Sequence, residues 1–307
     1  MAVQYLFNRA WNVTIGFPGG VGKSYDSLHV TFDLHKESFG GCTNKSKVEV
    51  YNLSQDSRKF FQQKGLQITL KAGYQNLLKT IMIADVTRMV TKRKGPDIVT
   101  EFECGEGEKV LSTMYFKKSY PPGTPYYQII QDILVQMQDN GIGIGVVANL
   151  PNTRFNQGRT FATSAKTILD FLLKKANLEW SIFNNQIQIL PRNAHSEQAT
   201  IVLSKASGLI GVPTQKDDGI EFLSLLNPDL TPGAPVQLIC GEVAGQLDVY
   251  NLNQSSISGF YRIRNAHYEG DSHGEKWWVR CEANRIVPVQ NLKLNQGKNL
   301  QPAVTNG

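Results

Sequence analysis

Alternation of apolar and polar residues is the main signal in the first third of the chain. In residues 28–35, apolar side chains occupy every second position, which is the period of a strand with one buried face. Further strand-like runs are VQYLF, WNVTIGF, KVEVYNLS, LQITLKAGY, LKTIMIADVTRMVTKR and DIVTEFECGEG. A short helix is predicted between Ser54, a suitable N-cap, and Gly65, a suitable stop. Closely spaced strands protect their edges by closing on themselves, so we predict an antiparallel β-barrel in residues 1–116.

The period changes to that of helices in the middle of the chain. The segment YPPGTPYYQIIQDILVQMQDNG opens with prolines and a glycine, places Ile129, Ile130, Ile133, Leu134 and Met137 at helical spacing and ends at Gly141. A second helix is predicted in TSAKTILDFLLKKANLEW, with Ser164 near its start. The strand-like runs EWSIF and QIQIL follow, joined by Asn184 and Asn185. We therefore predict a small α+β insert in residues 117–204, with its helices packed on a short sheet.

Strand signals return after residue 205. Extended runs are broken at Asn227-Pro228, and GFYRIRNAHYEGDSHGEKWWVRCEANRI predicts a hairpin with GDSHGE as its turn. We predict a second β-barrel in residues 205–290 and an extended tail in residues 291–307, where no apolar period is present. The predicted fold class is α+β and mainly β, with two barrels flanking the insert. The Val-Tyr-Asn-Leu shared by VEVYNLS and LDVYNLNQSS is a short match that duplication would explain.

Composition and charge describe a globular chain without a dominant charged surface. The 307 residues suffice for two or three domains, and contents of 41% hydrophobic and 19% charged residues are ordinary for globular proteins. The net charge is +6, but basic residues cluster only at Lys92-Arg93-Lys94 and Lys117-Lys118, which we interpret as solvated loops. No apolar run approaches the length of a membrane span, so we expect no membrane-spanning segment.

Two glycine-rich segments look like nucleotide-binding loops but lack the required spacing. A phosphate-binding loop needs Gly, four residues and then Gly-Lys-Ser or Gly-Lys-Thr before a helix. In IGFPGGVGKSYDS, Phe17 occupies the position of the first glycine, and a strand pattern follows. The evenly spaced glycines of GIGIG do not match a dinucleotide fingerprint and are typical of a tight strand. We expect no nucleotide and no other cofactor.

One group of residues has the chemistry of a metal site. His267, Asp271 and His273 could ligate a divalent ion if the predicted hairpin brings them together. They fall, however, on a polar turn, where an Asp side chain commonly bonds to backbone N–H groups. We therefore expect no metal and assign His267 and Asp271 structural roles.

Paired acids are the other candidate chemistry. Catalysis by two carboxylates needs one acid in an apolar pocket and an ionised partner opposite it. Neighbouring acids on a surface turn usually face water, and acids on the polar face of a helix are usually solvated. The insert has one histidine, His195, so its acids also lack a histidine partner of close sequence position. We therefore expect no enzymatic activity. The acids considered are Glu101, Glu103, Glu106 and Glu108 before the insert, and Asp132, Asp139, Asp170 and Glu179 within it.

Segments at both ends of the chain resemble the tail proteins of contractile-tailed bacteriophages. In that pattern Gly-Ile precedes a strand, Ser-Leu-Leu-Asn-Pro makes a corner, and Tyr-Arg-Ile leads through a histidine and Gly-Asp to a Trp-bearing strand, as in residues 208–233 and 260–283. The first barrel of the family is similar to FDLHKE and NKSKVEVYNLS here. Together these segments resemble the small baseplate hub protein, which adapts a six-fold tail tube to a three-fold central spike.

The resemblance implies a structural virion protein. Hubs of this family form a homotrimeric ring in which each subunit contributes two related barrels, giving a pseudo-six-fold surface. The implied partners are the tail tube protein, the central spike protein and other baseplate proteins, with DNA passing through the lumen. The implied location is the tail baseplate of the virion, after assembly in the host bacterial cytoplasm.

Roles for individual residues follow from the hairpin and the corner. We expect Asn227 and Pro228 to turn the chain, and Asp271 and Ser272 to cap the hairpin through side-chain-to-backbone hydrogen bonds. Neighbouring strand residues point to opposite faces, so one of Trp277 and Trp278 should fill the core while the other faces a subunit or tube contact. Ordinary core or surface positions for both tryptophans are the alternative.

Two other functions stay open at this point. The separable insert would suit a tail-associated peptidoglycan hydrolase or cell-wall-binding protein. A baseplate component of a type VI secretion system or a tailocin would share the same sequence pattern.

Overall fold

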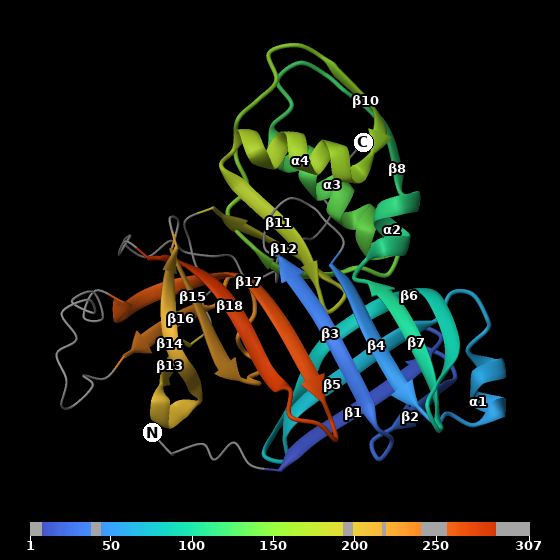
Figure 1. The fold of residues 1–307 in the computed structure, drawn as a ribbon. Coiled ribbons are helices and arrows are strands. Elements are labelled where there is room, and N and C mark those ends of the chain that lie inside the picture. The colour runs from blue at the N-terminus through green and yellow to red at the C-terminus, as the bar shows by residue number, and fades with distance from the viewer. Residues whose placement is uncertain (1–7, 38–43, 193–198, 217–218, 241–256, 287–307) are drawn as a thin grey trace.

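The computed structural model describes residues 8–37, 44–192, 199–216, 219–240 and 257–286. The predicted tail, the second Val-Tyr-Asn-Leu at 249–252 and His195 lie outside these residues. One large, mostly antiparallel sheet dominates the described chain, and a smaller unit of helices and short strands lies against one side of it (Figure 1). The prediction of a mainly β fold with few helices is confirmed.

The N-terminal region supplies strands in the spatial order β3-β4-β7-β6-β5-β1-β2, all antiparallel. Alternation decides which side chains enter the core: along β3, Val30, Phe32 and Leu34 are buried, whereas the residues between them face solvent. Helix α1 (Gln55–Phe60) begins at Ser54, whose hydroxyl accepts a hydrogen bond from the Ser57 N–H at 3.2 Å. The strands are β1 (Arg9–Gly16), β2 (Gly22–Tyr25), β3 (Val30–Glu37), β4 (Lys45–Tyr51), β5 (Gln67–Tyr74), β6 (Leu77–Lys94) and β7 (Asp97–Gly105).

The C-terminal region supplies the order β14-β15-β18-β17, with β16 on the free side of the first part of β17 and β13 parallel to β16. The 3-10 turn η1 (Lys205–Ser207) separates β13 from β14 in the chain. The strands are β13 (Ile201–Ser204), β14 (Leu209–Lys216), β15 (Gly219–Leu225), β16 (Pro235–Ile239), β17 (Gly259–Asp271) and β18 (Trp277–Arg285).

Strands β3 and β17 join the two regions into one sheet. Residues 265–271 of β17 pair antiparallel with residues 31–37 of β3, and Figure 1 shows these strands side by side. One hydrophobic core, with residues from both regions, lies under the joined sheet. The two separate barrels are not confirmed: within the described residues no strand pairing closes either region. A closed barrel would have hidden the edges at β3 and β17 within each region, but these two strands pair with each other instead.

The middle of the chain has a core of its own. All five apolar positions predicted for the first helix of the insert are fully buried: Ile129, Ile130, Ile133, Leu134 and Met137. Val110 and Met114 join this core, so the packed unit begins before residue 117. Its elements are α2 (Glu108–Thr113), β8 (Tyr115–Tyr120), α3 (Tyr126–Asp139), β9 (Gly143–Val147), β10 (Arg159–Ser164), α4 (Ala165–Lys175), β11 (Leu178–Phe183) and β12 (Gln186–Pro191).

Local turn chemistry explains the short sheets of this unit. Asn184 and Asn185 have φ of 50° and 61°, the left-handed values of a two-residue hairpin turn, and they join β11 to β12. The glycines of GIGIG lie in and just before β9, which pairs in parallel with β12. Gly145 lies so close to β12 that a Cβ atom there would come within 3.1 Å of the Ile187 carbonyl oxygen. The prediction of a tight strand therefore has a steric basis.

A buried ion pair lies where the insert meets the sheet. The Lys36 ammonium lies 3.4 Å from the Glu106 carboxylate, and each side chain is 1% exposed. The same carboxylate accepts hydrogen bonds from the Asn44 side chain at 3.0 Å and from the Asn184 N–H at 3.0 Å. The expectation that Glu106 faces water is wrong, because these donors replace its hydration.

Both basic clusters lie on strands rather than in the predicted loops. Residues 92–94 end β6 and residues 117–118 lie within β8, and all five side chains are exposed, as a solvated role requires. Lys92 pairs with Glu101 at 2.6 Å, and Lys118 pairs with Asp132 at 2.8 Å. One residue of each cluster is therefore neutralised by a neighbouring acid.

Candidate functional site at the junction of the two regions

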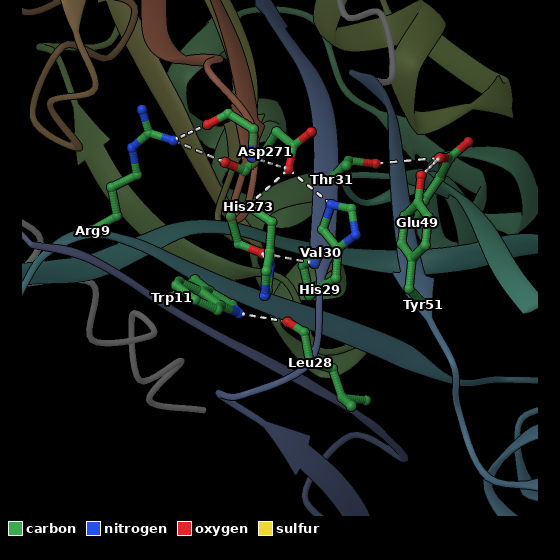
Figure 2. Close-up of polar contacts among 12 residues, drawn as sticks. Arg9, Trp11, Leu28, His29, Val30, Thr31, Glu49, Tyr51, Asp271 and His273 are labelled. Atoms are coloured by element: carbon green, nitrogen blue, oxygen red, sulfur yellow. Dashed lines mark hydrogen bonds and ion pairs between the residues drawn. The ribbon is translucent and has the colours of Figure 1, made fainter. Parts of the chain in front are cut away.

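The turn between β17 and β18 contacts the N-terminal region and is organised by Asp271. Its Oδ1 accepts hydrogen bonds from the backbone N–H groups of His273 and Gly274 at 2.9 and 2.8 Å, and lies 2.8 Å from His29 Nε2 (Figure 2). Burial would raise the pKa of Asp271, but these three contacts outweigh burial and lower the pKa below its ordinary value. The ionised carboxylate thus holds the turn and ties it to the residue that precedes β3.

Arg9 and Ser272 fasten the same turn to the N-terminal strands. The Arg9 guanidinium donates hydrogen bonds to the carbonyl oxygens of Asp271, at 3.1 Å, and Gly274 (Figure 2). The Ser272 hydroxyl accepts a hydrogen bond from the Val30 N–H at 2.9 Å. Ser272 therefore bonds to the start of β3, whereas we expected it to cap its own hairpin.

Trp277 and Trp278 lie on opposite faces at the start of β18. Trp277 is 2% exposed, donates its Nε1–H to the Gly73 carbonyl oxygen at 3.1 Å and packs edge-on against Phe32, with ring centroids 5.4 Å apart. Trp278 is partly exposed and donates to the Glu269 carboxylate at 2.8 Å. Trp277 fills the core shared by both regions, and Trp278 lies on the open face of the sheet.

Asn227 and Pro228 occupy the corner after β15. The Asn227 Oδ1 accepts a hydrogen bond from the Asp229 N–H at 3.0 Å, and its carbonyl oxygen accepts one from the Leu230 N–H at 3.2 Å. Pro228 is buried within this turn. The Lys79 ammonium of β6 pairs with the Asp229 carboxylate at 2.8 Å, so the corner is a further contact between the two regions.

The structure separates the residues considered as a metal set. His267 Nε2 lies 2.7 Å from Asp33 Oδ1, and the imidazole stacks on His35. His273 instead belongs to the Asp271 turn, with its ring centroid 4.7 Å from that of His29. The hairpin therefore places His267 in a different group from Asp271 and His273.

The open face of the joined sheet carries interleaved charges. Outward positions of β15, β18, β17, β3, β4, β7 and β6 lie side by side in the strand register. Acids and bases of these strands and of the β17–β18 turn form ion pairs along this charged face: Lys47 with Glu49 and Glu101, Lys92 with Glu101, Arg88 with Glu103, Lys276 with Glu269, Arg280 with Glu221, and Lys216 with Glu221 and Glu282. Such pairing leaves no continuous basic stripe across the described strands.

Several of the acids considered as catalytic residues have structural partners as well. Burial raises the pKa of Glu179 to about 7, and Arg262, which forms an ion pair with it, is the main opposing influence. This pair links the insert to β17. Asp132 accepts hydrogen bonds from Lys118 and Tyr120, and Asp170 accepts one from the Trp180 indole N–H at 2.8 Å.

Comparisons with solved structures show the class of fold. A tail protein from Neisseria meningitidis MC58 is similar with a TM-score of 0.60 at 8% identity, over 91% of this chain and 97% of that one. The 43 kDa tail protein of prophage MuSo2 from Shewanella oneidensis gives a TM-score of 0.59 at 12% identity, over 90% and 98% of the two chains. This chain therefore has the fold of phage tail proteins.

A secretion-system protein shares the same fold. An Escherichia coli component of the type VI secretion system, itself described as similar to the bacteriophage T4 tail proteins gp27 and gp5, gives a TM-score of 0.57 at 11% identity, over 84% of this chain and 74% of that one. No protein-family model and no curated protein matches the sequence. None of the described helices is both long and apolar enough to cross a membrane.

Proposed function

We propose that the chain is a structural baseplate protein of a phage tail or a related secretion machine, acting as the hub between tube and spike. The similarity in fold to phage tail proteins over about nine-tenths of the chain supports this proposal. The structural contacts made by the acids considered above support a role without catalysis. In this role the chain is part of the virion baseplate and contacts the tail tube, the central spike and other baseplate proteins.

The observation that carries the proposal is the pairing of β3 with β17. It places two β-rich regions side by side in each chain. Three copies in a closed ring would thus present six such regions to a six-fold tube. We propose three domains in this arrangement, with the bounds 1–116, 117–204 and 205–290 predicted from the sequence and 291–307 as the tail. At these bounds, α2 packs with the insert and β13 pairs with the C-terminal strand β16.

The ends of the joined sheet supply a means of closing the ring. Within the described residues, β2, β13 and β14 each pair with a strand on one side only. Terminal strands carry backbone groups that a strand of another chain can satisfy. We place β14 of one copy against the edge of the next, where Val212, an exposed valine on β14, would become buried.

The charged face is suited to line the opening of the ring. Nucleic acid is held mainly by Lys and Arg contacts to its phosphates. Interleaved acids weaken such contacts, because Lys47, Arg88, Lys276 and Arg280 on this face already have carboxylate partners. DNA would then pass through the lumen without being retained, although a chain with a net charge of +6 would otherwise attract its phosphates.

Size-exclusion chromatography with light scattering tests this proposal. The purified chain should have three times the 34.2 kDa mass of one copy, and in a complex with the spike the mass of the spike is added to that of three copies. Val212→Glu should shift the trimer toward monomer without changing the free energy of unfolding of the monomer. Val135→Glu is the matched control, since Val135 is a similarly exposed valine on α3, and it should stay trimeric. A monomeric wild-type chain in the presence of the spike, or equal effects of the two substitutions, would contradict the proposal.

A further inference from the structure

Three side chains on the charged face depart from its pattern of Lys and Arg ion pairs. Asp33 and His35 are two residues apart on β3, and His267 is the direct cross-strand partner of His35 on β17. Residues two apart on a strand, and direct partners across two strands, project from the same face. Lys47, the cross-strand partner of Asp33 on the other side, pairs with glutamates of β4 and β7 instead. The Asp33 carboxylate is therefore directed at the two imidazoles.

The donor atoms of these side chains converge. His267 Nε2 and His35 Nε2 lie 2.7 and 3.0 Å from the same oxygen, Asp33 Oδ1, and the two rings stack with centroids 3.9 Å apart. One donor atom from each residue lies within 4.8 Å of the other two. Zinc ligands lie about 2.0–2.2 Å from the metal, so donor atoms around one ion are separated by roughly 3–4 Å. Small side-chain rotations would bring this set to that spacing.

We propose that Asp33, His35 and His267 bind a divalent transition-metal ion of the zinc class, with solvent completing the coordination. Two imidazoles and one carboxylate suit Zn²⁺, Co²⁺ or Ni²⁺ better than Mg²⁺ or Ca²⁺, which prefer oxygen ligands. A neutral imidazole that carries its proton on Nδ1 leaves the Nε2 lone pair for the ion. The Asp33 and His35 side chains are half exposed, so an ion from solvent can reach them.

The proposed ion would connect the two regions. Asp33 and His35 belong to β3 and His267 belongs to β17, and these strands form the pairing that joins the regions into one sheet. A bound ion stabilises the state that binds it, and the stabilisation grows with the logarithm of the ion concentration once that concentration exceeds Kd. Saturation should therefore raise the midpoint of thermal unfolding of the whole sheet. This inference stands whether or not the chain is a baseplate hub.

Calorimetric titration of the untagged, EDTA-dialysed full chain with ZnCl₂ tests the site. One ion should bind per chain, and Co²⁺ should give the visible absorption of a low-symmetry, four- or five-coordinate complex. His35→Gln and His267→Gln should each weaken binding by about tenfold or more, since even groups outside the ligand set cost 10–100-fold at metal sites. The same variants should lose the Zn²⁺-dependent rise in the unfolding midpoint, while their metal-free midpoints match that of the metal-free wild type.

His273→Gln is the matched control because it removes another exposed imidazole and leaves the three proposed ligands intact. It should bind Zn²⁺ as the wild type does. The proposal would be overturned if the wild type shows no saturable binding. It would also be overturned if binding survives both His35→Gln and His267→Gln, or if His273→Gln weakens it as much as they do.

Discussion

Replacing Trp277 by alanine tests whether the two β-rich regions share one core. The side chain is 2% exposed and contacts Phe32 and Gly73 of the N-terminal region. Deleting a buried Trp side chain costs about 3–5 kcal/mol, and the Gly73 carbonyl left without its donor adds about 1 kcal/mol or more. We expect Trp277→Ala to lower the free energy of unfolding by about 4–6 kcal/mol. That loss is comparable to the whole stability of many domains.

Trp278→Ala is the matched control. It removes a partly exposed side chain and one hydrogen bond to the Glu269 carboxylate, for an expected cost of about 1–2 kcal/mol. Urea unfolding followed by circular dichroism measures both costs, and chromatography shows whether Trp278→Ala leaves a folded chain that no longer assembles. Equal destabilisation by the two substitutions would refute the reasoning, as would two separate unfolding transitions of which only the C-terminal one responds to Trp277→Ala.

Further predictions concern ionisable groups at the contacts between regions. The pKa of Asp271 is lowered in the folded chain, so the stability that this group contributes is present above its ordinary pKa of 3.8 and is lost as pH falls through the folded pKa. Asp271→Asn should reduce this loss of stability in acid, measured by urea unfolding at a series of pH values. An unchanged pH profile would count against the contacts with His29 and the backbone. The pKa of Glu179 is raised from 4.5 to about 7, so the folded chain binds more protons than the unfolded chain between these values. Stability from this group should fall as pH rises through that window, and Glu179→Gln should remove the trend; a Gln variant with the wild-type slope would assign the trend to other groups.

Local sequence signals predicted the elements that depend on neighbouring residues. Ser54 and Ser164 cap the helices expected after them, and the Asn184-Asn185 pair makes the expected hairpin turn. These succeed because capping and left-handed turns are decided within about four residues. The phosphate-loop likeness around Gly22 was correctly set aside, since β2 begins at that residue.

Features that depend on distant pairing could not be obtained in this way. The pairing of β3 with β17 joins residues more than 200 positions apart, and the register that faces His35 with His267 follows from it. The same pairing joins both regions in one sheet, and the two predicted closed barrels are not confirmed. Arg9 was missed because its acceptors are backbone carbonyl oxygens of a turn near the other end of the chain.

The burial of Lys36 could have been predicted from the sequence. The residue continues the buried positions of Val30, Phe32 and Leu34, so the alternation itself places it on the inner face. A charged residue at a buried position requires a partner of opposite charge. The identity of that partner, Glu106, depends on how the insert packs and could not be derived from the strand pattern.

Electron cryomicroscopy of the purified chain assembled with its spike tests the central claim most directly. The account predicts a closed ring of three copies around an open centre, with six β-rich regions at the surface that meets the tube and the charged face toward the opening. A particle in which the copies do not encircle an opening, or in which β3 and β17 of one chain are not paired, would contradict it.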